Sequence, residues 1–177
     1  MTRDAFLTDN DYTKAYECIY YHDPKRWSET PTLMKQILNN QSWSDYIKYL
    51  DGNGHISDKI NQLPNDEGGI YMFFIQGQTL PSSEMYLAYI GRARCTTNQN
   101  IRKRVKEYLR ESSRKNGRHK IKRLFRYWKD CLHIRYFSTK DTTLIEEGER
   151  TLIRAVLPPF NDDIPDKIEY KAPQSAF

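Results

Sequence analysis

The stretch GIYMFFI at residues 69–75 decides the fold, together with the stretch MYLAYIG at residues 85–91. Both are rich in β-branched and aromatic residues, which are typical of strands. The polar loop between them contains Gly77 and Pro81, which favour turns. The two stretches are therefore predicted to form an antiparallel hairpin.

The chain after this hairpin predicts further helices and one more strand. The expected elements are helices at residues 100–111 and up to about 129, a strand at 132–138, and a helix from Thr142 or Thr143 to about Val156. We therefore expect an α+β protein in which a small central antiparallel three-stranded sheet is flanked by helices, over residues 66–161.

Residues 1–65 are expected to form a helical N-terminal extension. The helical patterns are the stretch from Tyr12 to Tyr21, TPTLMKQILNN at 30–40 with Thr30 or Thr32 as its cap, and SWSDYIKYL at 42–50. A turn at Asp-Gly-Asn-Gly, residues 51–54, is expected to end the last of these helices. Residues 162–177 are rich in Asp and Pro and are expected to form an irregular tail.

Composition places the chain among single-domain proteins. It has 177 residues, of which 38% are apolar, and its longest apolar stretches fall short of the ~20 residues of a membrane-spanning helix. The start MTRDAFLTDN is too polar for a signal peptide, so we expect a cytoplasmic protein with no membrane partner. Its three cysteines, Cys18, Cys95 and Cys131, show no paired spacing and predict neither a disulfide framework nor a zinc site.

Positive charge is concentrated in one segment. Between Arg92 and Asp130 the chain has 15 lysines and arginines and three acidic residues, although the net charge of the whole chain is only +5. Aromatic residues, among them Tyr108 and Trp128, alternate with these cations. Such a segment predicts a surface that contacts a phosphate backbone, the alternative being a solvated helical face without a partner.

Two side chains are marked by their positions on predicted helices. At about 100° per residue, Glu149 falls within the apolar half of the last helix, where an ionised carboxylate must bind a cation or form an ion pair. Arg104 and Tyr108, spaced i and i+4, lie together at the edge of an earlier helix. Glu149 is therefore a candidate metal ligand or ion-pair member, and Arg104 and Tyr108 are a candidate ligand-binding pair.

The tripeptides Gly69-Ile70-Tyr71 and Tyr89-Ile90-Gly91 resemble those that define the GIY-YIG nuclease superfamily. The similarity continues through Arg104 and Tyr108 to a helix that bears Glu149, and it ends at Asn161, which follows a proline. It thus covers residues 66–161. Two departures are Arg92, where many relatives have Lys, and an inserted CTTNQN at 95–100, which leaves Arg102 as an alternative to Arg104.

The resemblance implies a metal-dependent DNA endonuclease with a defined set of site residues. The implied catalytic residues are Tyr71, Tyr89, Arg104, Tyr108, Glu149 and Asn161. Glu149 would bind Mg²⁺ or Mn²⁺, Arg104 would clamp the scissile phosphate and Tyr71 would be the general base. DNA-binding residues are expected to be Arg92, Arg94, Lys120, Lys122 and Arg123.

The sequence leaves more than one biological role open. A helical extension and a basic insert are similar to those of restriction or defence members, and a homodimer would supply two sites for double-strand cleavage. A repair or structure-specific nuclease is one alternative. The other is a catalytically inactive nucleic-acid-binding module that keeps the fold.

Two further patterns imitate metal sites. DGNGHI at 51–56 matches the middle of a calcium-binding loop, but that register places Tyr49 and Ile60 where carboxylates are required, so a turn is the preferred interpretation. Asp166, Glu169 and Lys171 imitate a nuclease metal site, at a spacing that is too short for the usual arrangement.

Overall fold

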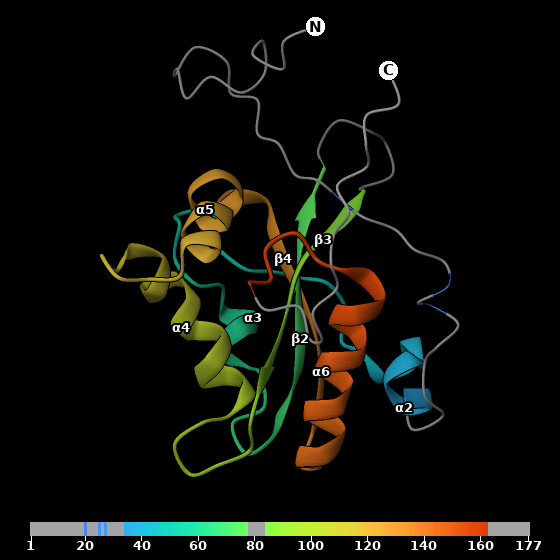
Figure 1. The fold of residues 1–177 in the computed structure, drawn as a ribbon. Helices are drawn as coiled ribbons and strands as arrows, with labels where there is room; N and C mark the ends of the chain where they lie inside the picture. Colours follow the sequence, from blue (N-terminus) through green and yellow to red (C-terminus); the bar gives the residue numbers. More distant parts are fainter. Residues whose placement is uncertain (1–19, 21–24, 26, 28–33, 78–83, 163–177) are drawn as a thin grey trace, which may run out of the picture.

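The computed structural model describes Tyr20, Lys25, Trp27 and residues 34–77 and 84–162, and Figure 1 shows its ribbon. The fold is α+β. In chain order the elements are α2 (Lys35–Leu38), η3 (Asn40–Ser42), β1 (Ile47–Lys48), α3 (Asp58–Asn61), β2 (Gly68–Gln76), β3 (Met85–Ala93), α4 (Ile101–Ser113), α5 (His119–Trp128), η4 (Lys129–Cys131), β4 (Leu132–Thr139) and α6 (Thr142–Val156).

The strands form one antiparallel sheet in the order β1-β4-β2-β3. The predicted hairpin is confirmed, with Tyr71 opposite Gly91 and Ile70 opposite Arg92. The third predicted strand is confirmed as β4, which pairs with the other side of β2. The expectation of three strands is corrected to four, because β1 adds to the free edge of β4.

β1 lies within residues 42–50, for which the expectation of a helix is wrong. The backbone N–H of Tyr49 donates to Leu132 O at 2.9 Å, which extends the pairing with β4. The Tyr49 ring is completely buried and lies edge-on against Phe73 and Phe125, with centroids 5.3 and 5.4 Å away. Strand pairing and the burial of this ring outweigh the local helical pattern.

The turn at residues 51–54 is present, but it follows a strand and not a helix. Leu50 and Ile56 form an antiparallel bridge on either side of it. Oδ1 of Asp51 accepts hydrogen bonds from the backbone N–H groups of Asn53 and His55, both at 2.8 Å. The carboxylate thus stabilises its own turn, as Asp commonly does, which supports the turn interpretation over a calcium loop.

Only part of the N-terminal region is described. The expected helix over 30–40 is present as the short α2, which begins after Met34 and has no side-chain cap. The candidate caps Thr30 and Thr32 lie outside the described residues, as do residues 12–19 and the tail from residue 163, which includes Asp166, Glu169 and Lys171. Within the described ranges, no helix is long and apolar enough to cross a membrane.

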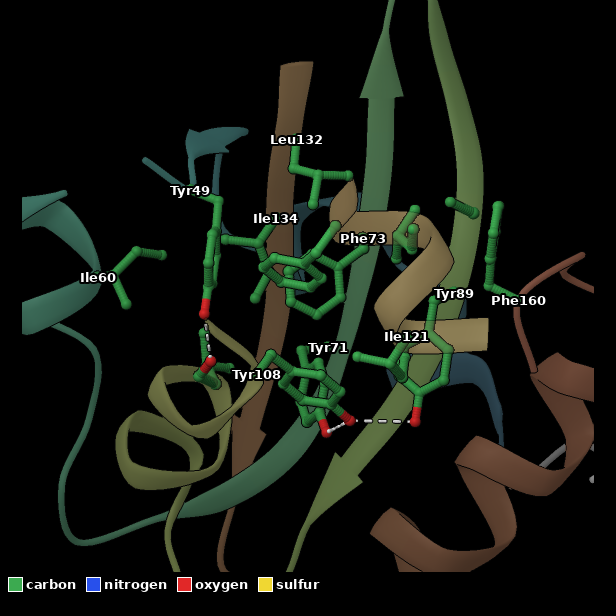
Figure 2. Close-up of a cluster of buried hydrophobic side chains, with 14 of the residues drawn as sticks. Tyr49, Ile60, Tyr71, Phe73, Tyr89, Tyr108, Ile121, Leu132, Ile134 and Phe160 are labelled. Carbon is green, nitrogen blue, oxygen red and sulfur yellow. Dashed lines mark hydrogen bonds between the residues drawn. The ribbon is translucent and has the colours of Figure 1, made fainter. Parts of the chain in front are cut away.

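Helices cover both faces of the sheet, and Figure 1 shows α4 and α5 on one side and α6 on the other. Side chains of β2 alternate between the two cores, as the pleat requires: Tyr71 and Phe73 belong to an aromatic-rich core, and Ile70 belongs to a second, aliphatic core with residues of α2 and α6. Figure 2 shows the first core, in which the rings of Tyr71, Tyr89 and Tyr108 meet. β2 is consequently buried along most of its length.

Helix α6 starts and ends close to the predicted positions. Oδ1 of Asp141 accepts from the backbone N–H of Leu144 at 3.0 Å and so caps the helix. A Cβ on Gly148 would lie 2.4 Å from Ile37 Cδ1 and 2.6 Å from Ile70 Cδ1. The missing side chain lets α6 pack directly against these two isoleucines, and the next residue, Glu149, pairs with Arg92 of β3.

The segment that follows α6 lies along the open edge of β3. The backbone N–H of Phe160 donates to Ala88 O at 3.1 Å. The side-chain amide of Asn161 accepts from the N–H of Ile90 at 3.0 Å and donates to the C=O of the same residue at 2.7 Å. The segment after α6 thereby covers the outer edge of β3, which carries Tyr89 and Arg92 toward one cleft.

Candidate functional site

A cleft of about 630 Å³ opens beside β3. It brings together residues from β2, β3, α4, α6 and the segment after α6. Of the predicted site residues, its lining includes Tyr71, Tyr89, Arg92, Arg94, Arg104, Glu149 and Asn161. Because β3 is the edge strand, residues that point to either face of it can reach the same opening.

Three tyrosine hydroxyls form a chain at the inner wall of this cleft. The hydroxyls of Tyr71 and Tyr108 are 2.7 Å apart, and the Tyr108 hydroxyl donates to that of Tyr89 at 3.0 Å (Figure 2). Since Tyr108 has one proton and donates it to Tyr89, Tyr71 is the donor in the other bond. Tyr108 is completely buried behind residues that line the cleft.

The environment of these phenols opposes their ionisation. Burial, followed by the proximity of Tyr108 and Tyr89, raises the pKa of Tyr71 well above its ordinary value, while the nearby Arg104 acts in the opposite direction. Burial also raises the pKa of Tyr89, and the charge of Arg118 partly opposes this. For Tyr71, the direction of the shift is opposite to the one that a general base needs at neutral pH.

The two candidate arginines of α4 have different surroundings. Arg104 lines the cleft, lies over the Tyr108 ring at 5.3 Å, and pairs with Glu107 at 2.9 Å. Arg102 instead donates from Nε to the carbonyl oxygen of Leu63. The geometry therefore favours Arg104 as the residue that contacts a ligand in the cleft.

Glu149 lies on the cleft with its carboxylate paired to Arg92. Its side chain is only 18% exposed, and Oε2 is 2.8 Å from Nη1 of Arg92. Burial raises the pKa of Glu149, whereas Arg92 and then Arg104 lower it. Of the two roles expected for Glu149, ion-pair member and metal ligand, the structure contains the ion pair.

The cleft has an excess of positive charge. Its lining holds five arginines against the carboxylates of Glu149 and Asp162. One of the arginines, Arg94, is half exposed and pairs with Glu146 at 2.9 Å, so its charge is partly neutralised. A groove with this balance attracts polyanions.

Sequence reasoning missed Arg118, which also lines the cleft. It forms the N-cap of α5, and its guanidinium joins Glu111 to the hydroxyl of Tyr89. Neither periodicity nor spacing distinguishes this arginine from the other cations of the basic segment. Only the packing of α5 against α4 shows its location.

Asn161 was expected to be a catalytic residue, but its side chain bonds to the backbone of β3. Its side-chain oxygen and nitrogen both bond to the backbone of Ile90, and the residue is buried. These bonds hold the strand segment that bears Tyr89 and Gly91. Its side chain therefore supports the cleft wall.

The structure separates the three cations expected from the basic helix. Lys120 donates from Nζ to the carbonyl oxygen of Asn161 and so joins α5 to the segment after α6. Lys122 and Arg123 line a second hollow on α4 and α5, together with His119 and Arg126. Residue 118 lines the first cleft and residue 119 lines the second, so each hollow borders the start of α5.

The donor atoms suit one hydrated divalent cation. Among the residues that the structure describes, no three His, Cys, Asp or Glu side chains gather where they could hold a metal ion. Mg²⁺ is commonly held by one or two carboxylates, with waters and substrate phosphates as its other ligands. Glu149, a carboxylate on a cleft rich in arginine, fits such a site once a phosphate is present.

Comparison of the chain with protein-family models, with curated proteins and with solved structures gives no match. A functional conclusion depends on the geometry of the cleft and on the residues that line it.

Proposed function

We propose that this protein is a metal-dependent DNA endonuclease of the GIY-YIG type, with a role in restriction or defence. One observation carries the proposal: Tyr71, Tyr89, Arg104 and Glu149, from four separate elements, line one positively charged cleft. These are residue types that phosphodiester hydrolysis uses to orient a phosphate, balance its charge and hold a cation.

Within this proposal, β2, β3 and β4 with α4, α5 and α6 form the nuclease domain, and β1 is added by the N-terminal extension. Two copies would provide the two sites that double-strand cleavage needs.

Arg104 is assigned to the scissile phosphate. Tyr108 holds its guanidinium from the ring face and Glu107 pairs with it, so the charge is oriented before DNA arrives. A fixed cation stabilises the negative charge that develops on the non-bridging oxygens more effectively than a mobile one. Its charge also favours ionisation of Tyr71.

Glu149 is assigned to the metal ion, with Arg92 as its partner when no metal is bound. Mg²⁺ or Mn²⁺ would neutralise phosphate charge and act as a Lewis acid there. As an arginine, Arg92 contributes positive charge and hydrogen-bond donors and not base catalysis. Once released from Glu149, its guanidinium is free to contact a phosphate oxygen.

Tyr71 is assigned to proton transfer from the attacking water. Its hydroxyl bonds to Tyr108, and burial opposes its ionisation, so this role requires the cations of the cleft to stabilise a phenolate. Arg104 is the cation whose effect on Tyr71 is in the required direction. Tyr108 bonds to the Tyr71 hydroxyl and so holds it in place, and Tyr89 lines the cleft beside the phosphate position.

The test is a nicking assay on supercoiled plasmid DNA, with Mg²⁺, with Mn²⁺ and with chelator. The wild type should cut only with metal, and Glu149→Gln should bind DNA without cutting. Glu147→Gln, a neighbouring and more exposed position on α6, is the matched control and should cut normally. Cutting in chelator, or metal-dependent cutting by Glu149→Gln, would contradict the proposal.

The same assay separates the alternatives. A wild type that binds but never cuts is an inactive binding module. Preferential cutting of branched over linear duplexes indicates a structure-specific nuclease, and sequencing of the product ends identifies a restriction specificity.

A further inference from the structure

Arg118 is held in one orientation by Glu111. Nε and Nη2 of Arg118 donate to the two carboxylate oxygens of Glu111 at 2.6 and 3.1 Å. This two-point pairing fixes the plane of the guanidinium and leaves Nη1 to donate to the hydroxyl of Tyr89 at 3.1 Å. The carboxyl of Glu111 has a lowered pKa, first through its hydrogen bond with Arg118, so the pair stays ionised at neutral pH.

Two aromatic rings support the same guanidinium. The Arg118 Cζ atom lies 5.7 Å from the ring centroid of Tyr89 and 5.3 Å from that of Tyr108. Contacts of a cation with ring faces add to the fixed geometry of the pair. Arg118 therefore cannot change its hydrogen bond to Tyr89 without losing several contacts together.

The hydroxyl of Tyr89 has both of its acceptor positions filled. Arg118 can only donate, and the Tyr108 hydroxyl also donates to Tyr89. A phenol oxygen has two lone pairs and one proton, so the proton of Tyr89 must be directed to a third partner. Because Tyr89 lines the cleft, that partner is a group within the cleft.

We infer that Arg118 is a positioning residue that turns the Tyr89 hydroxyl into a hydrogen-bond donor toward an anionic phosphate oxygen in the cleft. The inference rests on the proposed function and deepens it, since it assigns how the phosphodiester is recognised. While all three tyrosines are neutral, the chain of hydrogen bonds runs from Tyr71 through Tyr108 to Tyr89 and on to the substrate. Glu111 takes part by fixing Arg118.

A double-mutant cycle with Arg118→Gln and Tyr89→Phe tests this role. If Arg118 acts through the Tyr89 hydroxyl, each single change should lower kcat by about 10²-fold, the order found for loss of one preorganised donor. The double variant should be little slower than either single variant, because both remove the same interaction. KM should change much less than kcat.

Additive losses, or a rise in KM alone after Arg118→Gln, would overturn the inference, because Arg118 would then contact DNA directly. Arg118→Lys keeps a charge but not the fork, so its kcat should stay as low as that of Arg118→Gln. Arg110→Gln removes an exposed charge from the same segment and is the control for a general loss of positive charge. Melting curves identify any variant that does not fold.

A second measurement does not depend on cleavage. Protein labelled with ¹³C at the tyrosine ζ carbon reports hydrogen bonding at each phenol, and Tyr89→Phe assigns the relevant resonance. Arg118→Gln should shift the Tyr89 resonance and leave that of Tyr49 unchanged, since the Tyr49 hydroxyl bonds to Val105 O elsewhere in the core. A DNA duplex added with chelator should shift the Tyr89 resonance in the wild type.

Failure of the proposed function and failure of the inference about Arg118 give different results. If the wild type never cuts DNA, the proposed function fails, but the resonance still decides whether Arg118 controls the Tyr89 hydroxyl. If the Tyr89 resonance does not shift with Arg118→Gln, or does not shift when the DNA duplex is added, the inference is overturned even for an active nuclease.

Discussion

The ring of Tyr71 lies directly over Gly91, its partner on the neighbouring strand. A Cβ at residue 91 would be 2.6 Å from the Tyr71 hydroxyl oxygen and 2.7 Å from Cζ. This contact joins the first tripeptide of the hairpin to the second, because the tyrosine of one strand can occupy its site only if the other strand has no side chain at that position.

Gly91→Ala is therefore expected to displace Tyr71 and break its hydrogen bond to Tyr108. Forcing a methyl group into this contact should lower the free energy of unfolding by about 1–3 kcal/mol. Cleavage should fall as well, since the tyrosine chain is disturbed. Urea denaturation and the nicking assay measure the two effects. Gly52→Ala, where a Cβ meets no atom within 4 Å, is the control, and unchanged stability in Gly91→Ala would contradict the contact.

Arg104→Ala and Arg102→Ala should have opposite profiles. Loss of Arg104 removes a charge from the cleft and should reduce kcat by about 10²–10³-fold, while DNA affinity changes only a few-fold. Loss of Arg102 removes a bond to Leu63 O and should mainly reduce stability. Single-turnover cleavage and thermal melting measure the two effects in each variant. A larger loss of cleavage in Arg102→Ala than in Arg104→Ala would assign the phosphate contact to Arg102.

DNA binding is expected to depend on the second hollow. Lys122→Glu with Arg123→Glu should weaken DNA binding and reduce its salt dependence between about 50 and 200 mM. The reason is that binding releases fewer counterions when fewer phosphates are neutralised. The control is Lys35→Glu with Lys59→Glu, an equal change of charge at exposed positions outside the basic segment. Lys120 is left intact because it joins α5 to Asn161 O. Equal salt slopes in both double variants would remove this hollow from the interface.

The stability of the metal-free protein should depend on the ionisation of Glu149. Burial raises its pKa above its ordinary 4.5 in the folded state, so the folded protein binds more protons there than the unfolded chain. Its contribution is fully present below 4.5 and is lost as the pH rises through the folded pKa. From about pH 4 to about pH 7, Glu149→Gln should thus gain stability relative to the wild type.

Urea denaturation at the two pH values measures this difference. Glu147→Gln, at an exposed position, should show no such trend. A Glu149→Gln variant that loses stability relative to the wild type as the pH rises would show that the Arg92 pair outweighs burial. Because Arg92 pairs with this carboxylate, removal of the Glu149 charge also leaves Arg92 without its ionic partner.

The sequence alone determined the hairpin, α4 and α6, because each depends on local rules. The apolar runs at 69–75 and 85–91, rich in β-branched and aromatic residues, specify two strands, and a helical wheel places Glu149 within the apolar half of α6. The motifs in these segments that resemble those of a nuclease superfamily supplied candidate residues, most of which line one cleft.

Only the tertiary structure decided β1, the bonds of Asn161 and the place of Arg118. Tyr49 becomes part of the core because β4 offers a free edge and aromatic neighbours. The Asn161 amide bonds to Ile90, and Arg118 bonds to Tyr89, across segments that are distant in sequence. Such contacts follow from how the elements pack, and local periodicity and residue type carry no information about them.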